Sequence, residues 1–163
     1  MIDKRYNIKE VAVEAAEGEI IMVTKTPIKV RYEETDKMGI VHHSNYAVWY
    51  EAARGDFIEA MGMRYSDMEE AGVMVPLVEL HCKYIKPARY EENLIVECRI
   101  GTFRGAKLEF FYTVKNEDGI VINEGSTVHA LTNTSLVPVN VKKTNPEVYE
   151  MLKRAYEGGF LLT

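Results

Sequence analysis

The chain has 163 residues, enough for one domain with a substantial core, and its 47% hydrophobic and 28% charged content is typical of a soluble globular protein. The formal net charge of −5 argues against general binding to nucleic acid or membrane surfaces, which a basic excess would favour. No apolar run approaches the roughly 20 residues of a membrane helix, and the charged residues 1–20 do not read as a signal peptide. We therefore expect a cytoplasmic protein with no membrane insertion and no nucleic-acid partner.

Two segments are distinguished in chain order. Residues 1–24 are interpreted as an N-terminal extension of unknown role, in which residues 9–18 could form a short helix ended by Gly18. Residues 25–163 are interpreted as the functional domain. Its first predicted element is a strand over residues 26–32, where the pattern alternates and ends in β-favouring residues.

A long amphipathic helix is predicted after a polar turn region over residues 33–43. Apolar residues recur at three- and four-residue steps and form one wide face, made of Tyr46, Trp49, Tyr50, Ala53, Phe57, Ile58 and Met61. Ser44 is a candidate N-cap, and Gly62 is well placed to end the helix in a left-handed conformation. The helix is then about 18 residues long, or roughly 27 Å.

The pattern changes to a two-residue period after Gly72. It predicts long strands over residues 75–84, 93–102, 107–115 and 120–132. The segments between them are short and turn-like, so successive strands are expected to pair antiparallel. Residues 146–157 predict a closing helix, with Tyr149, Leu152 and Tyr156 on one face. This order indicates an α+β fold in which one sheet covers the long helix.

Cysteine and histidine usage does not indicate a metal site. Cys82 and Cys98 lack CxxC spacing and are expected to be reduced, buried thiols, although a disulfide between neighbouring strands is geometrically possible. The four histidines, His42, His43, His81 and His129, form no HxxxH or HExxH pattern. His129, in a predicted strand, is interpreted as a packed or interface residue, and Glu51 with Arg54 as a surface pair. Gly-rich phosphate loops and dinucleotide motifs are also absent from the sequence.

Residues 35–54, TDKMGIVHHSNYAVWYEAAR, resemble the signature of the hotdog-fold acyl-CoA thioesterases of the 4-hydroxybenzoyl-CoA thioesterase type. The resemblance includes the short-chain acyl-CoA thioesterases encoded beside Tol-Pal envelope genes. Residues 84–90, YIKPARY, and 124–129, EGSTVH, support it. It covers about residues 25–140 and implies a curved antiparallel sheet wrapped around the long helix. It also implies two protomers that pair into a continuous sheet, with active sites at the subunit interface.

The resemblance implies roles for individual residues. Asp36 matches the catalytic carboxylate, and the backbone N–H of His43 matches the group that points at the thioester carbonyl. Asn45 and Tyr46 match the family's NY step and are expected to set the loop and helix of the substrate site. The remaining substrate-binding candidates are Trp49, which is either core or part of the acyl pocket, and Lys86 and Arg89, which either hold the coenzyme A phosphates or only confer solubility.

The chemistry of thioester cleavage suits this arrangement. The first turn of a helix leaves backbone N–H groups unpaired at the positive end of its dipole, and these stabilise a carbonyl oxygen that becomes negative. Asp36 could activate a water or attack directly to form an anhydride, and the residues do not choose between these routes. The structural alternative for Asp36 is an Asx-turn before Gly39.

The resulting hypothesis is an acyl-CoA thioesterase that hydrolyses a small acyl or aryl thioester to free acid and coenzyme A, without a cofactor. Two alternatives stay open: a thioesterase acting on acyl carrier protein, and a non-catalytic acyl-CoA-binding hotdog module. The resemblance implies a homodimer or a dimer-of-dimers tetramer, with acyl-CoA as the substrate partner.

Overall fold

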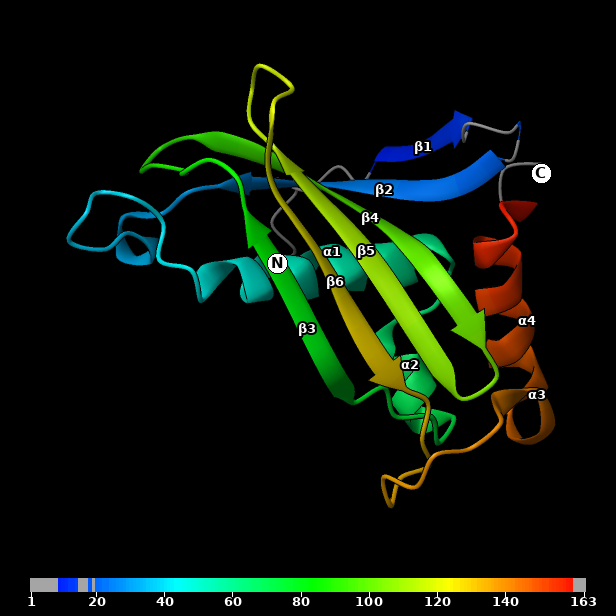
Figure 1. Cartoon of the computed structure of the whole chain (residues 1–163). Helices are drawn as coiled ribbons and strands as arrows, with labels where there is room; N and C mark the ends of the chain where they lie inside the picture. Colours follow the sequence, from blue (N-terminus) through cyan, green and yellow to red (C-terminus); the bar gives the residue numbers. More distant parts are fainter. Residues whose placement is uncertain (1–8, 15–17, 19, 160–163) are drawn as a thin grey trace, which may run out of the picture.

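The computed structural model describes residues 9–14, 18 and 20–159. The elements are β1 (Lys9–Glu14), β2 (Ile20–Lys29), η1 (Tyr32–Glu34), α1 (Asn45–Ala60), α2 (Tyr65–Glu70), β3 (Leu77–Tyr84), β4 (Asn93–Arg104), β5 (Lys107–Lys115), β6 (Val121–Ala130), α3 (Val141–Thr144) and α4 (Pro146–Tyr156). The sheet has the order β1-β2-β4-β5-β6-β3, with antiparallel pairing throughout. It curves around α1 (Figure 1), and this confirms the α+β hotdog architecture expected from the sequence.

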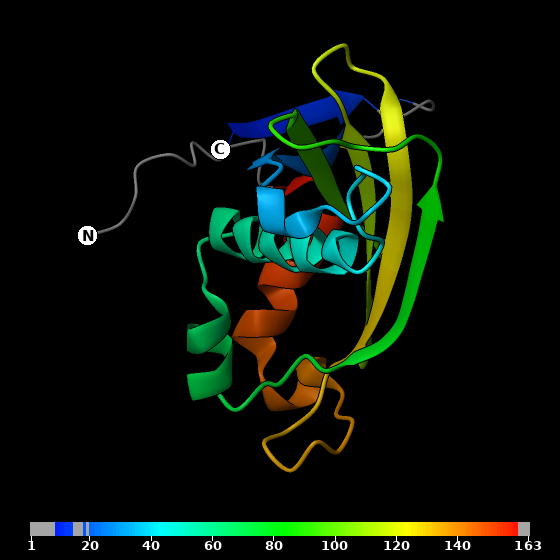
Figure 2. The same ribbon diagram turned by 90° about the vertical axis from the view of Figure 1, so that its left-hand side faces the viewer.

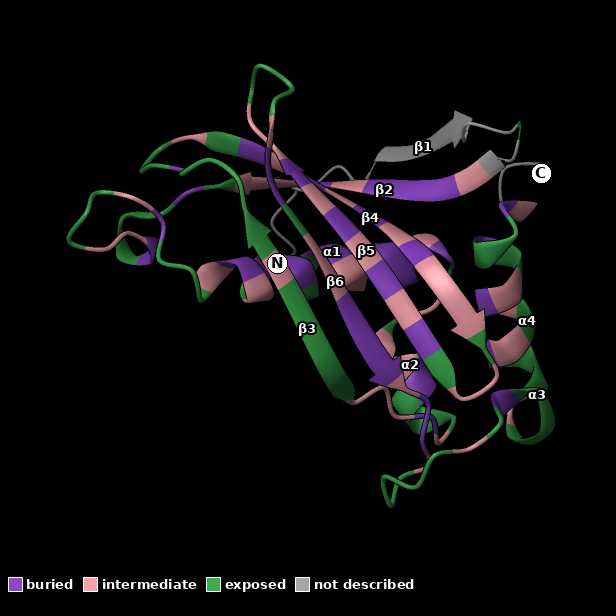
Figure 3. Ribbon diagram, viewed as in Figure 1, coloured by how far each residue is buried: buried purple, intermediate pink, exposed green. Residues whose placement is uncertain are grey.

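The core lies between α1 and the concave face of the sheet (Figure 2). Every apolar residue predicted for the face of the long helix is buried. On β4 and β5, buried residues alternate with more exposed ones (Figure 3), because successive side chains of a strand point to opposite faces. The predicted stop is also confirmed, since Gly62 has a φ of +93° just after the helix ends. No helix among residues 9–14, 18 and 20–159 is long and apolar enough to span a membrane.

Two predictions at the ends of α1 and the sheet need correction. The helix has 16 residues rather than about 18, and Ser44 gives it no side-chain cap because Ser44 itself has helical φ and ψ angles. The first strand of the domain is β2, which ends at Lys29, and Tyr32 already belongs to the short helix η1.

The N-terminal helix expected over residues 9–18 is wrong where the structure describes it. Lys9–Glu14 is strand β1, paired with β2, whereas residues 15–17 lie outside the described residues. The sequence KEVAVE has Val11 and Val13 at a two-residue spacing, which is the spacing typical of a strand. The predicted boundary after residue 24 falls inside strand β2, and Met22, on the N-terminal side of that boundary, is buried in the core.

The predicted pairing of β3 with β4 is also wrong. Strand β3 pairs with β6, and β4 lies on the far side of β5, beside β2. The connecting segment crosses the end of the sheet: the Ile85 amide donates to the Ile122 carbonyl at 2.9 Å, and the Glu91 amide donates to the Val30 carbonyl at 3.1 Å. The chain thus moves from the β6 side to the β2 side before β4 begins, which a tight hairpin could not do.

The remaining helices cover the rest of the core. The patterns in the sequence did not predict the short helices α2 and α3. Helix α4 matches the predicted closing helix, with Pro146 in its first turn and Gly158 after its end at a φ of +70°. Its buried face is Val148, Leu152 and Ala155, which packs against β4 and β2, whereas Tyr156 is exposed.

Candidate active site

The turn that carries Asp36 is held by its own backbone and side chain. The Asp36 amide donates to the Ile40 carbonyl, and the Gly39 amide donates to the Asp36 carbonyl, both at 2.9 Å. Oδ1 of Asp36 accepts the Met38 amide at 2.8 Å, so the Asx-turn considered from the sequence is present. No hydrogen bond to Oδ2 is recorded within the described part of the chain, and the half-buried carboxylate therefore keeps one oxygen available.

A buried carboxylate, Glu34, ties both ends of this loop to α1. One of its oxygens accepts the Trp49 indole N–H at 2.9 Å, and the other accepts the Arg31 amide at 2.7 Å. Its backbone carbonyl accepts the His42 amide at 2.8 Å and the Asn45 side-chain amide at 2.9 Å. Glu34 is only 3% exposed, so these bonds form where water does not compete.

The backbone of His43 is held at its carbonyl, whereas its amide, in the preceding peptide group, is open. The carbonyl accepts the Tyr84 hydroxyl at 3.1 Å, whereas the described residues provide no acceptor for the His43 N–H. The next amide is already used, because Ser44 N–H donates to Nδ1 of His42 at 3.3 Å. Since an amide can only donate, Nδ1 of His42 is the acceptor of this bond. The His43 amide is thus a donor just before α1 that is open to a ligand.

A pocket of about 360 Å³ opens beside this peptide. It is lined by Ile40, Val41, His43, Tyr46, Tyr84, Ile85, Lys86 and Pro87. Burial raises the pKa of Tyr46 to about 12, so its phenol stays protonated near neutral pH and adds no charge to a mainly apolar wall. Small-molecule sites are commonly about 300–1,000 Å³, so this pocket suits a small acyl or aryl group.

The candidate residues from the sequence divide into three groups. His43, Tyr46 and Lys86 line the pocket, and Asp36 lies on the adjoining turn, next to the lining residue Ile40 through the backbone bond described above. Asn45 bonds to loop carbonyls, and Trp49 is 2% exposed with its indole on Glu34, so both support the loop from within. Arg89 is exposed on the segment that continues from Lys86 and does not line the pocket.

Sequence reasoning missed Glu34 and Tyr84. The only signal for Glu34 is an acidic residue shortly before Asp36, and its exposed neighbour Glu33 gives the same signal. Tyr84 is predicted from the sequence only as the end of a strand and the start of the YIKPARY segment, whereas its ring packs edge-on against Tyr46 with the ring centroids 5.2 Å apart. Both act through partners that are distant in the sequence, and no local pattern reveals such partners.

Known proteins match this combination of fold and loop. A family model described as "Thioesterase-like superfamily" matches residues 30–155. The YneP protein of Bacillus subtilis (strain 168) is 37% identical over 134 residues, which is 82% of this chain and 97% of that protein. The acyl-CoA thioester hydrolase YbgC of Escherichia coli O157:H7 is 28% identical over 102 residues, covering 63% of this chain and 76% of YbgC. The crystal structure of a DHNA-CoA thioesterase from Staphylococcus aureus matches with a TM-score of 0.77 and 32% identity, covering 81% of this chain and 89% of that one.

A curved antiparallel sheet around a central helix is the hotdog fold, which this chain shares with the Staphylococcus aureus thioesterase. The chain belongs to the thioesterase-like superfamily, and its class is that of a thioester hydrolase.

Proposed function

We propose that this protein hydrolyses small acyl- or aryl-CoA thioesters to free acid and coenzyme A. The observation that carries the proposal is the open His43 amide, which borders a small apolar pocket beside the turn that bears Asp36. YbgC and the Staphylococcus aureus enzyme are both named for acyl-CoA substrates, which supports coenzyme A as the thiol half.

In the proposed reaction, the thioester carbonyl oxygen accepts the His43 N–H. The Tyr84 hydroxyl holds the carbonyl of the same residue, in the next peptide group, and so restrains the backbone of the donor residue before negative charge develops on the substrate oxygen. Asp36 then acts through its free oxygen, either as a general base on water or as a nucleophile that forms an anhydride. In both routes the carbonyl–sulfur bond breaks and coenzyme A leaves as a thiolate, which takes up a proton. On the base route, water adds to the carbonyl carbon as Asp36 takes its proton; on the nucleophile route, water then hydrolyses the anhydride to the free acid and restores the Asp36 carboxylate.

The proposal is tested by hydrolysis of a panel of short, long and aromatic acyl-CoAs, with the released thiol followed by a thiol reagent. We expect Asp36→Asn to lower kcat/KM by at least about a hundredfold, because an amide is neither a base nor a nucleophile. The matched control is Asp118→Asn in the exposed turn between β5 and β6, which should keep full activity. Equal activity of Asp36→Asn and wild type would remove Asp36 from the mechanism.

The same assay separates the alternative functions. Turnover of acyl carrier protein thioesters without turnover of acyl-CoA would identify the carrier protein as the substrate. Binding of acyl-CoA without any turnover would identify a binding module.

We further propose that two protomers pair through β3. Strand β3 is an edge of the sheet, and several large apolar side chains on or near it are exposed: Leu77, Val78, Leu80, Tyr84 and Ile85. An open edge with exposed apolar residues is a template for strand pairing. Because Tyr84 and Ile85 also line the pocket, a partner seated on this edge would help to close it.

The proposal includes Lys86 and Arg89 as contacts to the coenzyme A phosphates and the cytoplasm as the location. Lys86 is exposed at the mouth of the pocket, which suits a charged group just outside the reacting end. The described cysteines, Cys82 and Cys98, are both free thiols, which accords with a reducing compartment.

A further inference from the structure

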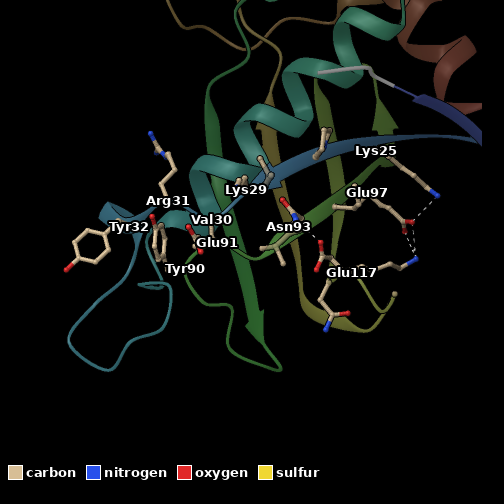
Figure 4. Close-up of a pocket in the computed structure, with 17 residues that line it drawn as sticks. Lys25, Lys29, Val30, Arg31, Tyr32, Tyr90, Glu91, Asn93, Glu97 and Glu117 are labelled. Carbon is tan, nitrogen blue, oxygen red and sulfur yellow. Dashed lines mark hydrogen bonds and ion pairs between the residues drawn. The ribbon is translucent and has the colours of Figure 1, made fainter. Parts of the chain in front are cut away.

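A groove of about 1170 Å³ lies outside the candidate active site, along β2, the start of β4 and the end of β5 (Figure 4). Thr26 of β2 faces α1, because its hydroxyl donates to Asp56 of that helix. Lys25 and Pro27, on either side of Thr26, line the groove. Since successive side chains of a strand point to opposite faces, the groove opens on the sheet face opposite α1. It is lined by four basic residues (Lys25, Lys29, Arg31 and Lys115) and three acidic ones (Glu91, Glu97 and Glu117). The groove thus carries a net charge of +1 on a chain whose formal net charge is −5.

The charges of the groove are paired at one end and more open at the other. Glu97 binds Lys115 at 2.9 Å and Lys25 at 3.8 Å, so these three groups satisfy one another. Lys29 has no ion-pair partner within the described part of the chain and is exposed. Arg31 binds Glu33 at 2.7 Å and Glu34 at 3.3 Å, and Glu91 and Glu117 also line the groove. The cation that stays open among the described lining residues is therefore Lys29.

Two exposed tyrosines stand at this more open end. Tyr32 is 77% exposed and Tyr90 is 51% exposed, and their rings meet edge to face with centroids 5.6 Å apart. Figure 4 shows them beside Arg31, at the opposite end of the groove from Lys25 and Glu97. Aromatic faces of this kind are the usual platforms on which nucleic-acid bases stack. Glu91, which follows Tyr90, has a φ of +70°, an uncommon conformation for a residue with a side chain. Backbone strain of this kind is concentrated at ligand-binding positions.

The groove and the active-site pocket share one connecting segment. Lys86 and Pro87, which follow β3, line the pocket, whereas Tyr90 and Glu91, a few residues later, line the groove. The amide of Val41, another residue of the pocket wall, donates to the Ala88 carbonyl at 2.8 Å in the middle of this segment. A ligand that leaves the pocket along residues 86–90 therefore reaches the tyrosines.

We propose that the tyrosine end of this groove binds the adenine nucleotide of a coenzyme A thioester, with the base stacked on Tyr90 or Tyr32 and a phosphate on Lys29. This inference rests on the proposed function, because an acyl-CoA has its reacting thioester at one end and its nucleotide at the other. The pocket of about 360 Å³ accommodates only the reacting end, so the nucleotide needs a second site. The separation of an apolar pocket from a groove with two exposed aromatic rings and an open lysine matches the chemistry of the two ends.

Binding is tested first without catalysis, with adenosine 3′,5′-bisphosphate as the probe in calorimetric titrations of the full chain. We expect the double variant Tyr32→Ala/Tyr90→Ala and the variant Lys29→Glu each to bind at least about tenfold more weakly than wild type. Tyr156→Ala on α4 and Lys143→Glu on α3 are matched exposed controls and should bind as wild type. The proposal is overturned if wild type does not bind the probe at millimolar concentration, or if the groove variants bind it as wild type does.

Kinetics then connect the groove to the reaction. The groove variants should raise KM for benzoyl-CoA about tenfold and leave kcat/KM for the benzoyl thioester of N-acetylcysteamine unchanged, because that substrate has no nucleotide. An equal loss with both substrates would show that the substitutions act on the catalytic loop, and would overturn the groove assignment. Failure of wild type to hydrolyse either thioester would count against the proposed function alone, since the titration with the bisphosphate is read independently.

Discussion

At the scale of single residues, Glu34 has the greatest influence on the candidate site. It has no contact with the pocket, yet it holds the backbone on both sides of Asp36 and the first residue of α1. Its buried oxygens also satisfy the indole of Trp49. Glu34 is thus a positioning residue in our proposal, and its loss should disturb the geometry of the reaction as well as the stability of the fold.

We expect Glu34→Ala to lower kcat by tenfold or more with little change in KM, and to destabilise the fold by about 1–3 kcal/mol, because buried donors lose their acceptor. Adding Trp49→Phe removes one orphaned donor, so the double variant should regain part of the stability but none of the kcat. Urea unfolding and steady-state kinetics measure the two effects. Glu33→Ala, at the exposed neighbouring carboxylate, is the control, and recovery of kcat in the double variant would assign Glu34 to stability alone.

A second set of residues forms a directed chain of hydrogen bonds inside the core. Arg54, expected on the surface with Glu51, instead donates to the hydroxyls of Tyr65 at 3.0 Å and Tyr112 at 3.1 Å. The chain runs on from Tyr112 to Thr127 at 2.7 Å and from Thr127 to Nε2 of His129 at 2.9 Å. His129 is 1% exposed, so its interpretation as a packed residue is confirmed.

The direction of this chain follows from its last acceptor. Nδ1 of His129 contacts the Val75 carbonyl at 3.2 Å and must donate to it, because a carbonyl can only accept. Nε2 therefore accepts from Thr127, whose own oxygen receives the Tyr112 hydroxyl. Burial, together with the charge of Arg54, lowers the pKa of His129 to about 4.

This pKa predicts that stability is lost in mild acid. Between pH 6.5 and pH 4 the unfolded chain binds a proton at His129 that the folded chain does not. The contribution of the neutral His129 to the free energy of unfolding is therefore fully present above pH 6.5, and about 2 kcal/mol of it should be lost as the pH falls through this window. Urea unfolding at pH 7 and pH 4.5 measures the change. His129→Gln should show a smaller pH dependence, and an identical dependence in both proteins would contradict the assignment.

At the scale of elements, the approach of α1 to the sheet depends on a glycine in β6. A Cβ built on Gly125 would overlap the hydroxyl of Tyr50, which also bonds to Asn123 on the same strand. The rings of Tyr50 and Tyr112 stack with centroids 4.3 Å apart, so the helix has little room to move away. The small residue thus sets the distance between helix and sheet near the middle of the core.

We expect Gly125→Ala to destabilise the protein by about 1–3 kcal/mol, the usual cost of overpacking a core. Ser126→Ala, at the next position on the opposite face of β6, should change stability by no more than about 0.5 kcal/mol. Thermal or urea unfolding distinguishes the two. Equal stability of Gly125→Ala and wild type would show that α1 shifts without cost.

At the scale of the whole molecule, the two edges of the sheet differ. Strand β1 covers the edge of β2, whereas β3 leaves apolar side chains exposed beside the pocket. Pairing of two β3 strands would bury these side chains and join the sheets.

We expect the wild type to sediment as a dimer or larger assembly, and Val78→Lys to sediment as a monomer with kcat lowered tenfold or more, because a charge on an edge strand opposes pairing. Leu136→Lys, at an apolar residue exposed elsewhere, should leave the assembly unchanged. Sedimentation velocity with parallel activity measurements decides this. A fully active wild-type monomer would contradict the shared-site proposal.

The sequence by itself determined the elements whose pattern is local. The period of the long helix marked every buried residue on its face, and glycines such as Gly62 marked ends that need a left-handed conformation. The strands after Gly72 were predictable for the same reason. The motif around Asp36 indicated the turn before the long helix through resemblance, because its residues are contiguous, and the catalytic role of that turn stays a prediction.

Only the tertiary structure decided which strands are neighbours and which polar groups meet. The choice of β6 over β4 as the partner of β3 depends on where residues 85–92 bond across the end of the sheet, and neither strand's own pattern encodes this. Glu34 on Trp49 and Arg54 on Tyr112 join positions far apart in the chain. Burial makes such bonds strong, and burial is a property of the assembled core rather than of any segment.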